Sequence, residues 1–192
     1  MRSPVFSATA ILIATTLTST PIVAQSPEKD SIIEELSRGV KARKIDVEEL
    51  RNSVKNRISV EPASTASSTI SAPSPIVDLP TVSFEIFFEY NSAALSPQSI
   101  PTLVKLGQAL KDDRLSRYRF LIAGHTDAAG GREYNRALSE RRADTVRTFL
   151  VASFGISADR LSTLGFGMEQ LRDVANPLSG LNRRVEVINI GQ

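Results

Sequence analysis

The sequence has 192 residues, of which 41% are hydrophobic, and a formal net charge of +2. These values fit an ordinary globular protein of one or two domains. The absence of cysteine excludes disulfides, thiol catalysis and thiolate metal sites, and the single histidine, His125, makes a zinc site hard to build. Because the few excess positive charges are interleaved with acidic residues, nucleic acid is not an expected partner. We expect no cofactor and no metal.

The N-terminal residues predict export from the cytoplasm. Arg2 is followed by an uncharged stretch, Val5 to Ala24, that contains the apolar run ATAILIATTL. This pattern is typical of a secretory signal, and we predict a signal peptide over residues 1–24, cleaved after Ala24. A spanning helix would need roughly 20 strongly apolar residues, and the Thr-rich second half, interrupted by Pro21, fits that badly. An uncleaved anchor is the alternative.

Residues 25–59 have the spacing of short amphipathic helices. Ser26 followed by Pro27 is a suitable helix start, and Asp46 with Glu49 has the spacing of a capping box. Apolar residues recur at intervals of three and four along this segment, at Ile33, Leu36, Val40, Val47, Leu50 and Val54. We predict a pair of short helices or a partly ordered tail. The alternative is a module, over residues 26–58, that binds itself or another protein.

Composition changes twice after this segment. Residues 60–81 are rich in Ser, Ala, Thr and Pro and contain little that a core would bury, which predicts a linker. Residues 82–192 carry the patterns of a folded domain. Its first pattern is an alternation of large apolar residues typical of a strand with one buried face, formed by Phe84, Ile86, Phe88 and Tyr90.

Two helices and three further strands are expected after that first strand. Ser96 and Pro97 predict the start of a helix, and its core stripe is Ile100, Leu103, Leu106 and Leu110. The unbroken run FLIA within RYRFLIAGHTD indicates a central strand covered on both faces. A second helix runs from about Arg132 to Phe154, with Gly155 placed for a C-cap. Strands at 159–165 and in NRRVEVINI complete an α/β fold, an α+β sandwich with helices on the sheet.

One residue of the second helix is out of place in its pattern. Leu138, Arg142, Val146 and Phe149 fall on one stripe, at spacings of four, four and three. Burying an unpaired charge costs several kcal/mol. Arg142 therefore needs a partner on the apolar side of the helix.

Several motifs of the domain occur together in one known family. The block GHTDAAGGREYNRALSERRADTVRTFL, preceded by FFEYNSAAL and followed by GFGMEQ and NRRVEV, resembles the OmpA-like C-terminal domain of Gram-negative envelope proteins. The resemblance covers about residues 82–192. It implies a βαβαβ-type domain with helices on a mixed four-stranded sheet, and non-catalytic binding of peptidoglycan through the diaminopimelate of the stem peptide.

The same resemblance implies the site residues. Asp127 matches the family's aspartate and would take the ligand's ammonium, while Arg142 matches the arginine and would take its carboxylate. The further implied ligand-binding residues are Asn135, Thr126, Asn91, Asn182 and Arg183. Asn182 and Arg183 are interpreted as supporting the site or contacting the glycan backbone. Thr126 and the backbone donors of residues 128–131 lie where a loop enters a helix, an arrangement suited to a carboxylate.

Other interpretations of these residues stay open. Arg142 could be an intramolecular partner of Glu85, Glu89 or Asp127, because structural ion pairs are commoner than ligand sites. His125 is expected to be structural or to support the site. No nucleophile, base and orienting group assemble in a recognisable spacing, so we expect no enzyme, and peptidoglycan processing is a weak alternative.

The resemblance and the predicted signal agree on a location. We expect a periplasmic protein of the cell envelope that tethers an envelope component to the cell wall, and association with the outer membrane stays open. Its partners would be peptidoglycan with a diaminopimelate-type stem and an envelope protein, or a second copy, bound through residues 26–58. The alternative function is that of an envelope scaffold acting through this helical segment.

Overall fold

The computed structural model describes residues 27–38, 46–58, 79–89 and 91–192. The predicted signal peptide and most of the predicted linker lie outside these ranges. Among the described residues, no helix is both long and apolar enough to cross a membrane.

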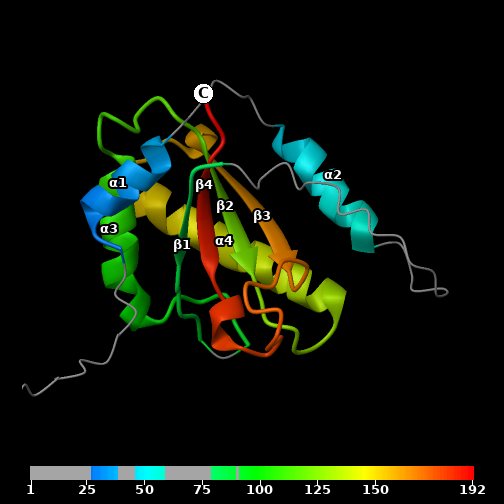
Figure 1. The fold of residues 1–192 in the computed structure, drawn as a ribbon. Coiled ribbons are helices and arrows are strands. Elements are labelled where there is room, and N and C mark those ends of the chain that lie inside the picture. Colours follow the sequence, from blue (N-terminus) through cyan, green and yellow to red (C-terminus); the bar gives the residue numbers. More distant parts are fainter. Residues whose placement is uncertain (1–26, 39–45, 59–78, 90) are drawn as a thin grey trace, which may run out of the picture.

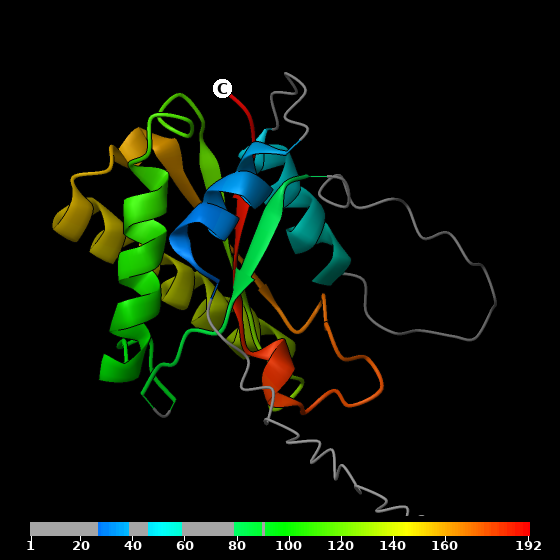
Figure 2. The ribbon, with the colours of Figure 1, turned by 60° about the vertical axis from the view of Figure 1, so that its left-hand side comes forward.

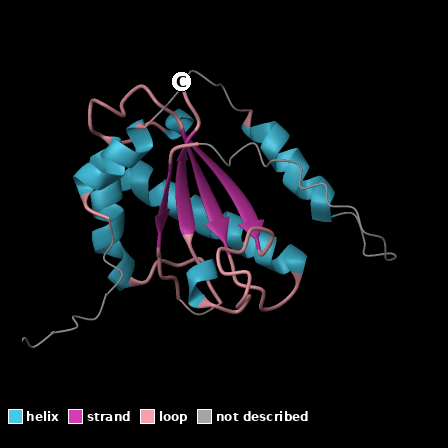
Figure 3. Cartoon of the chain, in the orientation of Figure 1, coloured by secondary structure: helices cyan, strands magenta, loops and turns pink. Residues whose placement is uncertain are grey.

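A mixed four-stranded sheet forms the centre of the domain (Figure 3). Its strands are β1 (Thr81–Phe84), β2 (Phe120–His125), β3 (Leu161–Gly167) and β4 (Val185–Asn189), in the order β1-β4-β2-β3. β2 pairs in parallel with β3 and antiparallel with β4, and β1 pairs antiparallel with β4. The fold class predicted from the sequence is therefore confirmed, and every residue of β2 is buried, as its apolar run indicated.

The helices are α1 (Lys29–Ser37), α2 (Val47–Ile58), α3 (Ile100–Leu110) and α4 (Arg132–Phe154). Short 3₁₀ turns cover residues 97–99, 158–160 and 180–182. In Figure 1, α4 crosses behind the sheet, α1 lies beside α3, and α2 stands on its own side of the sheet. The predicted bounds of α4 are confirmed, and Gly155 ends it with a left-handed φ of 62° that favours glycine.

Each face of the sheet has its own apolar cluster, because neighbouring residues of a strand point to opposite faces. Phe120 and Ile122 of β2 pack with α1, α3 and α4 in the larger cluster. Leu121 and Ala123 face the other way, into a smaller cluster that includes Leu50 of α2. The turned view of Figure 2 shows α1 and α2 as two separate covers of the domain.

The two N-terminal helices pack on the domain of their own chain. The apolar stripe of α1 is fully buried, at Ile32, Ile33 and Leu36. On α2, Arg51 donates to Glu140 Oε1 of α4 at 3.0 Å and to the carbonyl of Thr163 in β3 at 2.9 Å. Asp46 caps α2 as predicted, since its carboxylate accepts the Glu48 N–H at 2.9 Å. This segment thus contains two short helices whose described apolar residues pack inside the chain.

α4 lies unusually close to the sheet, because two glycines leave room for its backbone. A Cβ at Gly124 of β2 would come within 2.2 Å of the Ser139 carbonyl oxygen, and one at Gly165 of β3 within 2.5 Å of the Glu140 nitrogen. The hydroxyl of Ser139 also accepts the N–H of Gly167 at 2.9 Å. This close packing fixes the first half of α4 against the C-terminal ends of β2 and β3.

The structure corrects several predicted boundaries. The first strand was expected to continue to Tyr90, but β1 ends at Phe84, because its partner β4 begins at Val185, which pairs with Phe84. Ile86 is still buried, so the alternation of apolar residues indicated which side chains are buried and not which residues pair with another strand. The last two strands also begin later than predicted, at residues 161 and 185, since 3₁₀ turns occupy the residues near their starts.

The predicted start of α3 is corrected as well. Ser96 precedes a 3₁₀ turn rather than the helix, and its side chain makes no capping hydrogen bond. Ser99, buried and directly before α3, instead bonds the backbone N–H and C=O of Phe87, each at 2.7 Å. These bonds hold the chain that leaves β1 against the start of α3.

Candidate functional site

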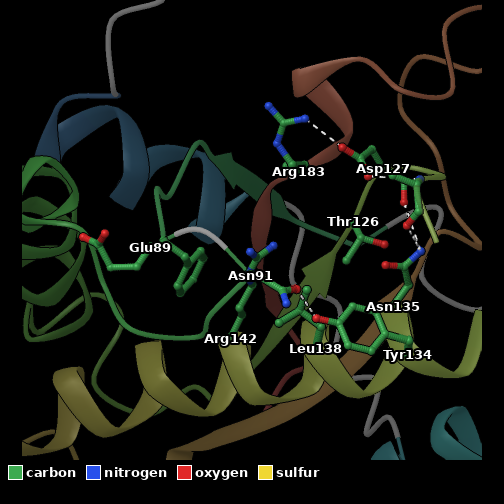
Figure 4. Close-up of a pocket in the computed structure, with 11 residues that line it drawn as sticks. Glu89, Asn91, Thr126, Asp127, Tyr134, Asn135, Leu138, Arg142 and Arg183 are labelled. Atoms are coloured by element: carbon green, nitrogen blue, oxygen red, sulfur yellow. Dashed lines mark hydrogen bonds and ion pairs between the residues drawn. The ribbon is translucent and has the colours of Figure 1, made fainter. Parts of the chain in front are cut away.

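A pocket of about 450 Å³ opens where β2 ends (Figure 4). Three parts of the chain form it: the segment after β1, the loop between β2 and α4 with the first half of α4, and the turn before β4. Its lining residues are Phe88, Glu89, Asn91, Thr126, Asp127, Ala129, Tyr134, Asn135, Leu138, Arg142 and Arg183. All the predicted site residues except Asn182 are therefore brought together here.

Arg142 lies half-buried on one side of this pocket. Its Nε donates to the carbonyl of Ser92 at 3.1 Å, and the guanidinium carbon lies 4.8 Å from the ring centroid of Phe88. Burial lowers the pKa of Arg142, and the neighbouring charge of Arg183 acts in the same direction. Within the described part of the chain, no carboxylate forms an ion pair with Arg142. The two Nη groups thus remain available to a bound carboxylate.

Asp127 has a different partner from the one that the sequence suggested. Its Oδ2 accepts from Nη1 of Arg183 at 2.7 Å, and its Oδ1 accepts from the backbone N–H of Ala129 at 3.2 Å. Figure 4 shows Asp127 and Arg183 pointing toward each other, with Arg142 apart from them. The interpretation of Arg142 as an ion-pair partner of Asp127 is therefore wrong.

Two polar residues of the predicted set form the floor of the pocket. Thr126 is 3% exposed, and among the described residues nothing bonds its buried hydroxyl oxygen. Asn135, equally buried, donates from Nδ2 to the carbonyl of Ala129 at 2.8 Å. Asn135 thus holds the loop that carries Asp127, while the Thr126 hydroxyl is a buried polar group that a ligand or water would satisfy.

A hydrogen bond joins two of the pocket-lining elements. The hydroxyl of Tyr134 on α4 donates to Oδ1 of Asn91, which has a left-handed φ of 52°. Sequence reasoning singled out Asn91 and missed Tyr134, although Tyr134 directly precedes Asn135 in the YN pair. Its side chain is exposed, and this bond places Asn91 beside the first half of α4.

The structure does not bring Asn182 to the pocket. Asn182 is fully buried, its Oδ1 accepts the N–H of Asp173 at 2.8 Å, and its Nδ2 lies 3.1 Å from the carbonyl of Pro177. Pro177 in turn accepts the N–H of Ala128 at 3.0 Å. Asn182 thus lies outside the pocket lining and holds a loop against the site, which agrees with its interpretation as a supporting residue, because its buried amide already bonds within that loop.

The predicted cluster of backbone donors at the start of α4 is also only partly available. The N–H groups of Ala128 and Ala129 already bond Pro177 and Asp127. Gly130 has a φ of 87°, so a turn explains this glycine. Anion binding through the N–H groups of Ala128 or Ala129 would therefore have to displace existing hydrogen bonds.

His125, the last residue of β2, lies directly behind the pocket. It is 2% exposed and stacks on Phe166 with ring centroids 5.2 Å apart. Its Nε2 is 3.5 Å from Oε2 of Glu186, which also pairs with Nε of Arg184 at 2.8 Å. Burial lowers the pKa of His125, so its neutral form is favoured. This placement fits the structural or supporting role expected for it.

Comparisons with known proteins agree on one family. Residues 87–184 match the model of the OmpA family. The chain is 37% identical over 101 residues to the peptidoglycan-associated lipoprotein of Mesorhizobium japonicum, which covers 52% of this chain and 58% of that protein. It is 40% identical over 105 residues to the peptidoglycan-associated lipoprotein of Pseudomonas aeruginosa, covering 53% and 59%. These matches span less than two thirds of either relative.

The chain is also similar to a solved structure, at lower sequence identity. The peptidoglycan-associated lipoprotein from Burkholderia pseudomallei is 28% identical and has a TM-score of 0.45, over 62% of this chain and 96% of that one.

Proposed function

The chain belongs to the OmpA family, and we propose that it binds peptidoglycan without catalysing a reaction. The observation that carries this proposal is the state of Arg142, a half-buried guanidinium in a pocket, without a carboxylate partner among the described residues. A bound carboxylate would offset the cost of burying that charge, which is otherwise several kcal/mol. The names of the relatives, peptidoglycan-associated lipoproteins, support peptidoglycan as the source of this carboxylate.

The ligand group that fits the pocket best is the zwitterionic end of diaminopimelate. Its carboxylate would accept two charge-assisted hydrogen bonds from the Nη groups of Arg142, since Nε already donates to Ser92. Its ammonium would lie against Asp127, and the unpartnered hydroxyl of Thr126 offers a further hydrogen bond. A lysine-type stem lacks the carboxylate at this end and would leave Arg142 unpaired.

The wider role proposed is that of a tether in the cell envelope, reached through the predicted secretory signal. We favour binding through the pocket over scaffolding through residues 26–58, because Ile32, Ile33 and Leu36 are already buried against the chain's own domain. An envelope partner would therefore have to recognise the polar faces of α1 and α2, or segments outside the described residues.

Co-sedimentation of the full chain with purified peptidoglycan sacculi tests the proposed function. Arg142→Ala removes the guanidinium, and Arg141→Ala removes an exposed positive charge from the adjacent position as a matched control. We expect wild type and Arg141→Ala to sediment alike and to be released by free diaminopimelate. Arg142→Ala should bind at least about tenfold more weakly, as expected for loss of charged hydrogen bonds worth about 1.5 to 3 kcal/mol. Equal binding by the two variants would contradict the proposal.

A further inference from the structure

The two charged groups assigned to the ligand differ in their present state. Arg142 has no ion-pair partner among the described residues, whereas Asp127 already holds a cation, the guanidinium of Arg183, at 2.7 Å. Figure 4 shows the remaining carboxylate of the lining, Glu89, directed away from these three side chains. The lining thus carries two guanidinium groups and two carboxylates, of which Asp127 alone is paired with an arginine of the lining.

An arriving ammonium must therefore compete with Arg183 for Asp127. Oδ2 of Asp127 accepts from Arg183, and Oδ1 accepts from the N–H of Ala129. The Asp127 side chain is only 15% exposed, so it has little room for two cations, while the Arg183 side chain is 52% exposed and is free to turn outward. Replacement of Arg183 exchanges one charge pair for another and leaves a guanidinium at the rim without a partner.

We propose that Arg183 determines the specificity of the pocket by holding Asp127 until a ligand brings a second negative group for the displaced guanidinium. This inference rests on the proposed function and refines its substrate class. The preferred ligand has one ammonium for Asp127, one carboxylate for Arg142 and a further carboxylate within reach of Arg183. Each of the three charged groups of such a ligand would then face a side chain of opposite charge.

The same arrangement would disfavour simple amines. A ligand that carries an ammonium alone would break the pair of Asp127 and Arg183 and supply no replacement partner for either arginine. A zwitterion without a second carboxylate would satisfy Asp127 and Arg142 but leave Arg183 unpaired. Discrimination between ligands then depends on an unfavourable state of the protein as well as on favourable contacts.

The test measures binding of two stem tripeptides that end in diaminopimelate to the full chain by isothermal titration calorimetry. Both peptides keep the ammonium and carboxylate at the side-chain end, and the other carboxylate of the diaminopimelate is free in one and amidated in the other. Wild type is compared with Arg183→Gln, and with Arg172→Gln as a control at an exposed arginine outside the pocket lining. Arg142→Ala is included as the test of the proposed function.

We expect wild type and Arg172→Gln to prefer the free peptide by about three- to fivefold, the size of a partly exposed charge pair. Arg183→Gln should bind both peptides equally, and the amidated peptide at least as tightly as wild type does, because Asp127 has lost its internal competitor. If Arg183→Gln binds both peptides more weakly and keeps the ratio of the two affinities, Arg183 is an ordinary ligand contact. The inference then fails, while the proposed function stands. If Arg142→Ala binds as wild type does, the proposed function itself fails.

Discussion

A half-buried arginine lies near each end of β2: Arg160 near its start and Arg142 near its end. The two differ in how many of their N–H groups are hydrogen-bonded within the chain. Beside the start of β2, Arg160 lies over the ring of Phe120 at 5.6 Å and donates to the carbonyls of Tyr118, Leu110 and Leu115 at 2.8 to 3.3 Å. At the pocket end, Arg142 lies over Phe88 at 4.8 Å and donates to the single carbonyl of Ser92.

Burial lowers the pKa of both Arg142 and Arg160, so exposure and electrostatics do not separate their roles. What separates them is hydrogen-bond satisfaction. Arg160 uses Nε and both Nη groups on backbone carbonyls and therefore acts as a structural clamp. Arg142 uses only Nε, so its two Nη groups can bind a ligand. A half-buried arginine indicates a ligand site only when its donors are left over.

The largest effect expected from this comparison is on stability. Arg160→Gln should lower the free energy of unfolding by about 2 to 4 kcal/mol, because several partly buried carbonyls lose their donor together. The measurement is urea denaturation followed by circular dichroism. Sacculi binding under native conditions should stay at the wild-type level. A variant as stable as wild type would show that water replaces the guanidinium at no cost, and the two arginines would then not differ as described.

A smaller effect, confined to the pocket end, should appear with pH. Burial lowers the pKa of His125 below its ordinary value of 6.5. The unfolded chain therefore takes up a proton near pH 6.5 that the folded chain does not, so stability falls as pH drops below that value, by at most about 1.4 kcal/mol per pH unit. Carboxylates such as Glu186, which faces His125, contribute below this range.

The check is urea denaturation between pH 7.5 and 5.5 of wild type and His125→Phe. Phenylalanine keeps a ring against Phe166 and does not titrate. Wild type should lose stability across this range, and the variant should change less. The same pH dependence in both proteins would mean that His125 is protonated equally in the folded and unfolded chains.

Much of the fold could be predicted because local patterns and tertiary packing agree. The glycine C-cap of α4 and the buried run of β2 are found as predicted. On the predicted stripe of α4, Leu138 and Val146 are buried, while Arg142 and Phe149 are only partly buried. The prediction for β1 failed because alternation records which side chains are buried and not which backbone groups find a partner. Residues 86 and 88 continue the alternation of apolar side chains, although the pairing of β1 with β4 ends at Phe84 and Val185.

The sequence predicted which residues form the candidate site better than it predicted which of them pair with each other. Asp127, Arg142, Asn135, Thr126, Asn91 and Arg183 all line one pocket. The pair formed by Asp127 and Arg183 joins residues 56 positions apart, and no local pattern carries that information. The role of Asn182 in holding a loop could not be predicted either, because a motif match identifies a residue but does not tell whether its side chain is buried. Arg160 was not singled out, since it lies in a short turn without helical periodicity.

The most direct test of the account is calorimetric titration of diaminopimelate into wild type and Arg142→Lys, with the unfolding free energy of both measured in parallel. Lysine keeps the positive charge and loses the two parallel donors. We predict about tenfold or greater loss of affinity, with stability within about 0.5 kcal/mol of wild type. Unchanged affinity, or a stability loss like that of Arg160→Gln, would show that Arg142 is a second structural clamp and that the pocket does not recognise a carboxylate through it.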